Sequence, residues 1–229
     1  MDEIRPMRAE VGIIPNADGS ALFASGKTVA IAAVYGPKQL HPANKRKPDR
    51  GIIRCEYNML PFSVSDRARP GPSRRSKEIS LVTESALSAV TDLSRFPGSV
   101  IDVQIMILQA DAGTRCAGVN AAAMALAHAG IVMREMVSSI AIGKIDDKIV
   151  VDITKEEEDW TEGEGSTDIP FSITSNNEVT HLQLDGYIQT KRFKEAIDAA
   201  KNACSKILEI QSRALKGEIV DENKGGKKK

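Results

Sequence analysis

The chain has 229 residues, a hydrophobic fraction of 41% and equal numbers of basic and acidic side chains, 31 of each. Such a chain is long enough to bury a sizeable core, and its composition is typical of a globular protein. The formal charge of zero excludes a global electrostatic field that would attract nucleic acid. A nucleic-acid role must therefore depend on local basic clusters.

Cysteine usage and the chain ends indicate the compartment. The three cysteines, Cys55, Cys116 and Cys204, are widely spaced and match no metal-ligand pattern, which favours a reducing environment. No apolar signal core or membrane-length apolar run is present, so we expect a cytoplasmic protein without membrane contact. Residues 1–217 are predicted to form a single domain, and residues 218–229 a flexible basic tail.

The first quarter of the chain is predicted to be mostly β-structure. Apolar runs or alternating apolar residues mark each strand, and the first two strands flank a turn signal that indicates a hairpin. Gly36-Pro37 is expected to end the third strand and to open a polar loop with a first basic cluster. The predicted strands are residues 11–14, 21–24, 29–35 and 52–60.

A loop rich in proline and arginine follows, with Ser73 as the expected N-cap of a helix from residue 74 to about 93. Arginines at the start of a helix oppose the helix dipole. Arg74 and Arg75 are therefore poor choices for stability, and a bound polyanion would explain them. Solvated surface arginines are the alternative interpretation.

The central unit is a predicted strand at residues 100–108, a turn at 109–115 and an Ala-rich helix at 116–129. Gly113 lets the backbone approach a ligand, the first helical turn leaves N–H groups unpaired, and Arg115 adds a fork of donors. The turn therefore predicts a site for an anion such as phosphate. In the alternative interpretation Thr114 is only an N-cap and Arg115 faces solvent.

The second half is predicted to contain a hairpin, two further strands and a long closing helix. These elements are residues 137–145, 148–153, 169–174, 179–184 and 191–215. The acidic run at 156–168 resembles a solvated loop. Asp168 differs from the rest of the run, because it directly precedes a strand and would be held at a rigid strand end.

Several long segments together resemble the ribonuclease PH family, and within it the catalytic ring subunits of archaeal exosomes. The matching segments are residues 2–6, 16–21, 32–37, 57–64, 69–80, 108–115 and 182–186. They cover nearly the whole chain. The resemblance implies an α/β (α+β) protein with the β-α-β-α ribonuclease PH fold of the ribosomal-protein-S5-domain-2-like type.

The implied activity is phosphorolytic 3′-to-5′ degradation of single-stranded RNA, in which inorganic phosphate is the co-substrate and nucleoside diphosphates are released. The implied activity also suggests the functional term hydrolase. The implied partners are a noncatalytic paralogous ring subunit, in a trimer of heterodimers, and RNA-binding cap subunits. Two alternatives stay open: a noncatalytic ring subunit that shapes an RNA channel, and a homohexameric ribonuclease PH that trims tRNA 3′ ends.

The resemblance also assigns roles to residues. Phosphate would bind at Gly113, Thr114 and Arg115, and RNA at Arg67, Arg69, Arg74 and Arg75. Arg115, Asp159 and Asp168 would be catalytic, with Asp159 and Asp168 holding a divalent metal, Mg²⁺ or Mn²⁺. In the family pattern, a further aspartate lies six residues before the one that Asp168 matches. Here position 162 is Glu, and Asp159 lies nine residues before Asp168 because residues 161–167 carry a short insertion. Glu162 is therefore the alternate carboxylate.

Overall fold

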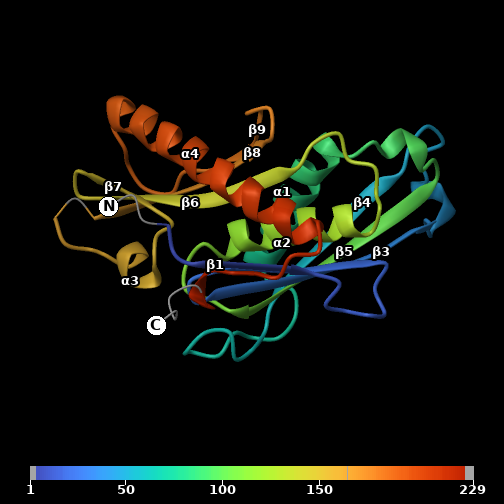
Figure 1. The fold of residues 1–229 in the computed structure, drawn as a ribbon, viewed down its shortest axis with the longest axis horizontal. Coiled ribbons are helices and arrows are strands. Elements are labelled where there is room, and N and C mark those ends of the chain that lie inside the picture. Colours follow the sequence, from blue (N-terminus) through green and yellow to red (C-terminus); the bar gives the residue numbers. More distant parts are fainter. Residues whose placement is uncertain (1–3, 164, 225–229) are drawn as a thin grey trace.

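The computed structural model describes residues 4–163 and 165–224 of the chain. Its elements form four layers, in which a sheet, two helices, a second sheet and a long helix follow one another (Figure 1). One main apolar core contains buried residues of both sheets, as expected when each layer covers the apolar face of the next. The β-α-β-α fold implied by the sequence is therefore confirmed.

The first layer is a six-stranded sheet, and every neighbouring pair is antiparallel except the last, which is parallel. Parallel neighbours need a crossover connection, and the helix α1 (Arg74–Val90) supplies it. In spatial order the strands are β10 (Val220–Asp221), β1 (Met7–Val11), β2 (Gly19–Ser25), β3 (Thr28–Gln39), β5 (Ser99–Gln109) and β4 (Ile52–Met59).

The second sheet has four antiparallel strands. The long helix α4 (Thr190–Leu215) covers its outer face (Figure 1). A short helix, α3 (Lys155–Glu158), lies in the connection between two of its strands. In spatial order the strands are β7 (Lys148–Val151), β6 (Val137–Ile145), β8 (Ser166–Thr174) and β9 (Val179–Leu182).

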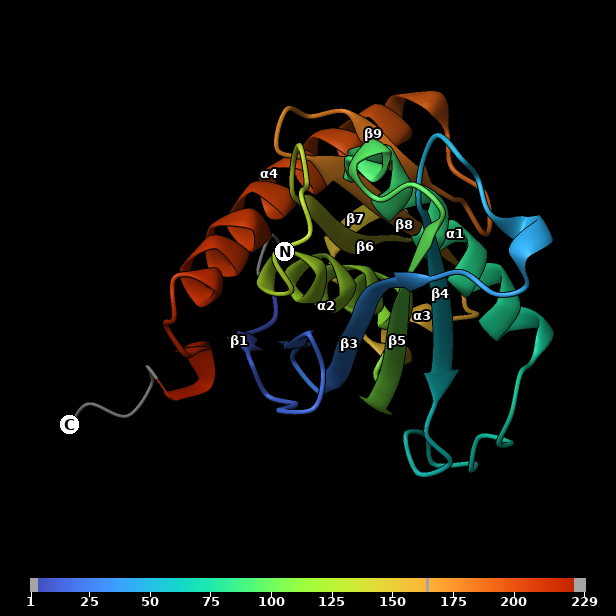
Figure 2. The ribbon, with the colours of Figure 1, turned by 90° about the vertical axis from the view of Figure 1, so that its right-hand side faces the viewer.

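The helix α2 (Thr114–His128) lies between the two sheets (Figure 2). Every residue from Cys116 to Leu126 is buried, because sheets cover the helix on opposite sides. A helix between two sheets packs closely along much of its surface, which favours the run of alanines, while Met124 and Leu126 fill larger spaces in the core. Its first turn is thereby held at one end of the molecule.

Several predicted boundaries differ from the structure, and the strand predicted at residues 11–14 is β1 at Met7–Val11. β3 continues through Gly36 and Pro37, and a register shift against β5 between Tyr35 and Lys38 accommodates the proline. β8 begins at Ser166, so Asp168 lies inside the strand and not before it. Part of the acidic run, predicted to be a loop, forms α3.

The prediction of a flexible tail from residue 218 is wrong at β10. Val220 is buried and pairs with Ala9 of β1, so the first sheet extends to Asp221. Two residues are too short a segment to carry a strand pattern. Residues 225–229 of the predicted tail, and Asp2 and Glu3 of the first matching segment, lie outside the described residues. Within the described part of the chain, no helix is long and apolar enough to cross a membrane.

Candidate active site

The turn between β5 and α2 has an unusual backbone. Ala112 and Gly113 are both left-handed, with φ of 54° and 63°. Gly113 is the N-cap of α2 and no side chain caps the helix, while Thr114 is the first helical residue. The interpretation of Thr114 as an N-cap is therefore wrong. Among the described residues, no side chain accepts from the first N–H groups of α2, which is the arrangement an anion needs.

Arg115 is 13% exposed, so it does not face solvent as the alternative interpretation required. Its Nη2 donates to Glu78 Oε2 on α1 at 3.1 Å. Its Nη1 is buried and has no hydrogen-bond partner among the described residues. Arg115 thus keeps one unused donor beside the turn, while Glu78 offsets part of its charge.

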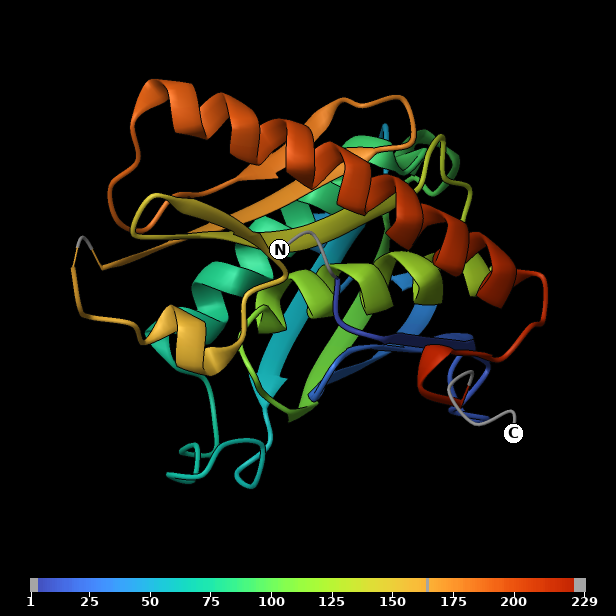
Figure 3. The same cartoon turned by 60° about the vertical axis from the view of Figure 1, so that its left-hand side comes forward.

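A pocket of about 340 Å³ opens between the turn, the start of α1 and α3. Figure 3 shows α3 and the loop before α1 at the same end of the molecule. This volume is within the range of small-ligand sites. The pocket is lined by Met59, Val64, Ser65, Asp66, Arg75, Ala110, Ala112, Thr114, Lys155 and Glu158.

The four arginines predicted to bind RNA are all exposed, and none forms an ion pair with a residue that the structure describes. Arg74 and Arg75 are the first residues of α1, whose N-cap Ser73 forms a capping box with Ser76. Arg67 and Arg69 lie in the preceding loop. Of the four, Arg75 lines the pocket. The positive charge at this helix start is therefore available to a polyanion.

Asp168 lies in β8, which follows the turn in the sequence, whereas the four arginines precede the turn. Its main-chain N–H and C=O both bond to Asp185, at 2.9 Å each. Its Oδ1 is buried without a partner among the described residues. Burial raises the pKa of Asp168 to about 6; the negative charge of Glu158 adds to the rise, and the positive charge of Arg115 offsets part of it.

Of the acidic residues near Asp159, Glu158 lines the pocket, whereas Asp159 and Glu162 do not. The Asp159 side chain is 62% exposed and pairs with Lys155 Nζ at 2.7 Å. Glu158 is 29% exposed, lines the pocket and acts electrostatically on Asp168. The sequence interpretation missed Glu158 because the acidic run suggested a solvated loop. Thr154 and Glu157, which form a capping box, were the signal for a helix there.

The carboxylates fit a divalent metal in chemical type, since Mg²⁺ and Mn²⁺ prefer oxygen ligands and Asp168 Oδ1 is unpartnered. Their number falls short: the described residues contain no group of three or more His, Cys, Asp or Glu side chains that could hold a metal ion. Asp159 and Glu162 stay predictions as metal ligands, and Glu158 joins them as a candidate.

Comparison with known proteins gives matches over nearly the whole chain. The 3′ exoribonuclease family matches with its domain 1 over residues 3–132 and its domain 2 over residues 135–203. The exosome complex component Rrp41 of Thermococcus kodakarensis is 49% identical over 215 residues, which cover 93% of this chain and 85% of that protein. Rrp41 of Thermococcus onnurineus is 47% identical over 228 residues, 98% of this chain and 90% of that protein.

Two solved structures share the fold. Rice (Oryza sativa) Rrp46 has a TM-score of 0.81 and 21% identity, covering 93% of this chain and 96% of that chain. The Archaeoglobus fulgidus exosome with RNA bound to the active site contains a chain with a TM-score of 0.78 and 24% identity, covering 91% of this chain and 89% of that chain.

The raised pKa of Asp168 predicts a dependence of stability on pH. Its pKa lies near 6 in the folded chain and near 4 in an unfolded one, so the folded state binds more protons between these values. Stability therefore falls as the pH rises from about 4 to about 6, by up to about 3 kcal/mol. We expect Asp168→Asn to raise the free energy of unfolding at pH 7 but not at pH 4, as measured by urea denaturation.

Asp198→Asn is the matched control, because Asp198 is exposed on α4 and surface substitutions change stability by less than about 0.5 kcal/mol. An equal gain from Asp168→Asn at both pH values would contradict the raised pKa.

Proposed function

Because the chain belongs to the 3′ exoribonuclease family, we propose that it is the catalytic subunit of an exosome ring and degrades RNA from the 3′ end by phosphorolysis. The observation that carries the proposal is the pocket where the uncapped start of α2, Arg75 of α1 and Glu158 of α3 meet. Cationic and amide donors on one side and carboxylates on the other are what this reaction requires.

In the proposed reaction, inorganic phosphate is held by Gly113, Thr114 and Arg115. One of its oxygens forms a bond to the phosphorus of the terminal phosphodiester, and the bond from that phosphorus to the ribose 3′ oxygen breaks. A nucleoside diphosphate is released, and the 3′ oxygen of the shortened RNA takes up a proton. The attack brings several negative charges together, which the Arg115 fork and the helix amides stabilise.

Asp168 is the proposed proton donor to the leaving 3′ oxygen. Since its pKa is raised to about 6, a fraction of the carboxyl groups carries a proton near neutral pH, as general acid catalysis requires. As the alternative to proton donation, the ionised Asp168, together with Asp159, Glu162 or Glu158, would hold a divalent metal, Mg²⁺ or Mn²⁺, which would supply charge stabilisation at the same oxygen.

Single-stranded RNA is proposed to bind through Arg67, Arg69, Arg74 and Arg75. Partners of this subunit would be a noncatalytic paralogous ring subunit, in a trimer of heterodimers, and RNA-binding cap subunits, in the cytoplasm. The name of the relatives, exosome complex component, supports an assembly of this kind. We also propose that residues 1–217 fold as one unit together with β10, since both sheets share the main core, which includes Val220.

The functional term hydrolase is wrong for this family's reaction, because phosphate and not water is the acceptor. Two alternatives remain distinguishable by experiment. A noncatalytic ring subunit would bind RNA in the complete ring without phosphorolysis, and the altered spacing before Asp168 favours it. A homohexameric ribonuclease PH would assemble and act on tRNA ends without a paralogous partner.

The central test is release of nucleoside diphosphates from oligo(A) by the ring reconstituted with its paralogous partner. We expect release only in the presence of phosphate, and none from Asp168→Ala, because that variant has no proton donor or metal ligand at this position. Chromatography of the products distinguishes diphosphates from monophosphates. Full activity of Asp168→Ala would contradict the assignment of Asp168.

Substitutions of an RNA-binding arginine and of Arg115 should affect different measured quantities. Arg74→Ala should weaken RNA binding and lower the slope of its salt dependence by about 0.7, since one backbone contact is lost. Arg115→Ala should instead raise the KM for phosphate. Filter binding at several salt concentrations and phosphate titrations measure the two effects, and identical behaviour of the two variants would refute the division of roles.

Because Glu78 pairs with Arg115, we expect that removing the charge of Glu78 increases the affinity for phosphate. Glu78 occupies a donor of Arg115 and places a negative charge near the proposed phosphate. We expect Glu78→Gln to lower the KM for phosphate by roughly three- to tenfold, because neutralising this carboxylate removes a repulsion of about one charge. Glu84→Gln, on the same helix, is the control. A raised KM in Glu78→Gln would mean that Glu78 orients Arg115 for binding.

A further inference from the structure

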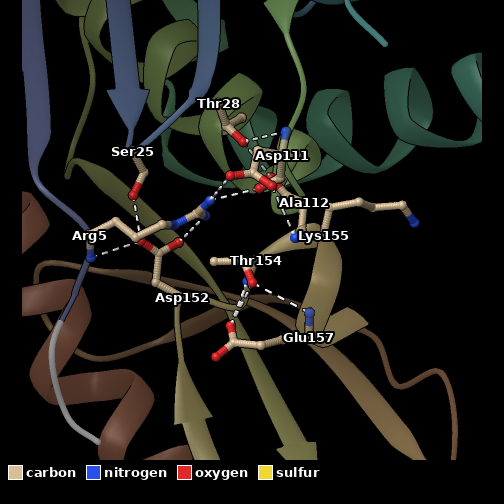
Figure 4. A network of polar contacts seen from close by, with 9 residues as sticks. All are labelled: Arg5, Ser25, Thr28, Asp111, Ala112, Asp152, Thr154, Lys155 and Glu157. Carbon is tan, nitrogen blue, oxygen red and sulfur yellow. Dashed lines mark hydrogen bonds and ion pairs between the residues drawn. The ribbon is translucent and has the colours of Figure 1, made fainter. Parts of the chain in front are cut away.

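Arg5 lies just before β1 and is only 12% exposed, although it is an arginine. Its guanidinium contacts two segments that are far apart in sequence (Figure 4). Nη2 donates to Asp152 Oδ1 at 2.5 Å, and Nη1 donates to the main-chain oxygen of Asp111 at 2.6 Å. One side chain thus joins the anion-binding turn to the segment that leaves β7.

Asp152 accepts hydrogen bonds from both the side chain and the main chain of Arg5. It is 6% exposed, and its Oδ2 accepts bonds from Ser25 Oγ at 2.5 Å and from the main-chain N–H of Arg5 at 3.2 Å. Its backbone is left-handed, with φ of 60°, and directly follows β7. Because Thr154 caps α3 two residues later, the position of Asp152 sets where α3 begins.

Arg5 and Thr28 both hold the turn between β5 and α2. A Cβ atom added at Gly113 would lie 3.5 Å from Arg5 Nη2, so the guanidinium lies close to this residue of the turn. Thr28 Oγ1 accepts from the N–H of Asp111 at 2.9 Å and donates to the carbonyl of Ala112 at 2.7 Å. Consecutive left-handed residues persist only where surrounding contacts hold them, and Arg5 and Thr28 make those contacts here.

The turn and α3 are also joined directly. Asp111 Oδ1 accepts the N–H of Lys155, the first residue of α3, at 3.1 Å (Figure 4). Lys155 and Glu158 line the pocket, whereas Arg5 and Asp152 do not. The Arg5–Asp152 pair therefore lies outside the pocket. Through Asp111 it is connected to the turn on one side of the pocket, and through Asp152 to α3 on the other side.

We propose that Arg5 is a positioning residue, which through Asp111, Gly113 and Asp152 fixes the anion-binding turn relative to α3 and thereby sets the affinity for phosphate. The proposal rests on the phosphorolytic function proposed above. Groups held by buried contacts of this kind keep their productive geometry, and a displacement of about 1 Å can reduce activity about a hundredfold.

The informative substitution is Arg5→Lys. Lysine keeps the positive charge beside the buried Asp152 carboxylate, so the variant should fold, but a single ammonium cannot serve Asp152 and Asp111 with the planar geometry of a guanidinium. Asp152→Asn is the second variant, which keeps the shape of the acceptor and removes its charge. Arg8→Lys is the matched control, because Arg8 is 44% exposed on β1 and pairs with Glu10.

The experiment measures the KM for phosphate, kcat and the Kd for RNA in the reconstituted ring. For Arg5→Lys and Asp152→Asn we expect the KM for phosphate to rise at least fivefold, while the Kd for RNA changes less than twofold and Arg8→Lys matches the wild type. A purely structural role would lower kcat through loss of active protein and leave the KM unchanged. An unchanged KM for phosphate, or an equal loss of RNA affinity, would overturn the proposal.

A second measurement separates this proposal from the proposed function. Inorganic phosphate that binds the folded chain raises its Tm, and we expect that rise in the wild type and in Arg8→Lys but not in Arg5→Lys. If the wild-type ring releases no diphosphates yet shows this pattern, the proposed function fails and the positioning role stands. A wild-type Tm that does not respond to phosphate overturns the positioning role.

Discussion

The enclosure of α2 between two sheets is the constraint on which the rest of the molecule depends. A helix covered on opposite sides must match the close approach of both sheets, and the alanines of α2, with Met124 and Leu126 in the core, do so. With its body fixed, α2 presents its uncapped start at one end of the fold. The loops that bring Arg75 and Glu158 converge on that end, so a packing constraint in the core determines where chemistry can occur.

The site concentrates groups that reduce stability in the absence of ligand. Arg74 and Arg75 oppose the dipole of α1 and are exposed without ion pairs to described residues. Asp168 is half-buried, its Oδ1 is fully buried and the charge of Glu158 acts on it, and Ala112 adopts a left-handed backbone. Each of these features is unfavourable alone. Together they place positive and negative charge close to the start of α2, where Arg75 and Glu158 both act electrostatically on Asp168, and such locally unfavourable groups are typical of binding sites.

Features with local signals could be predicted from the sequence. Ser73 as a helix start, β5, α2 and the hairpin of β6 and β7 have clear periodicity or turn residues, and the turn at Gly113 and Asp168 could be located. Features set by distant contacts could not. β10 depends on an available edge at β1, and the proximity of Glu158 to Asp168 depends on how α3 packs. The Arg5–Asp152 pair joins residues 147 positions apart.

That separation determines when the site is completed during synthesis, which proceeds from the N-terminus. Arg5, the four exposed arginines and the turn leave the ribosome first, and at that stage the buried acceptor of Arg5 does not yet exist. Asp152, α3 and Asp168 follow only in the last third of the chain. An interrupted translation product therefore carries the arginines proposed to bind RNA but lacks Asp168, the proposed proton donor, and only a nearly finished subunit possesses both.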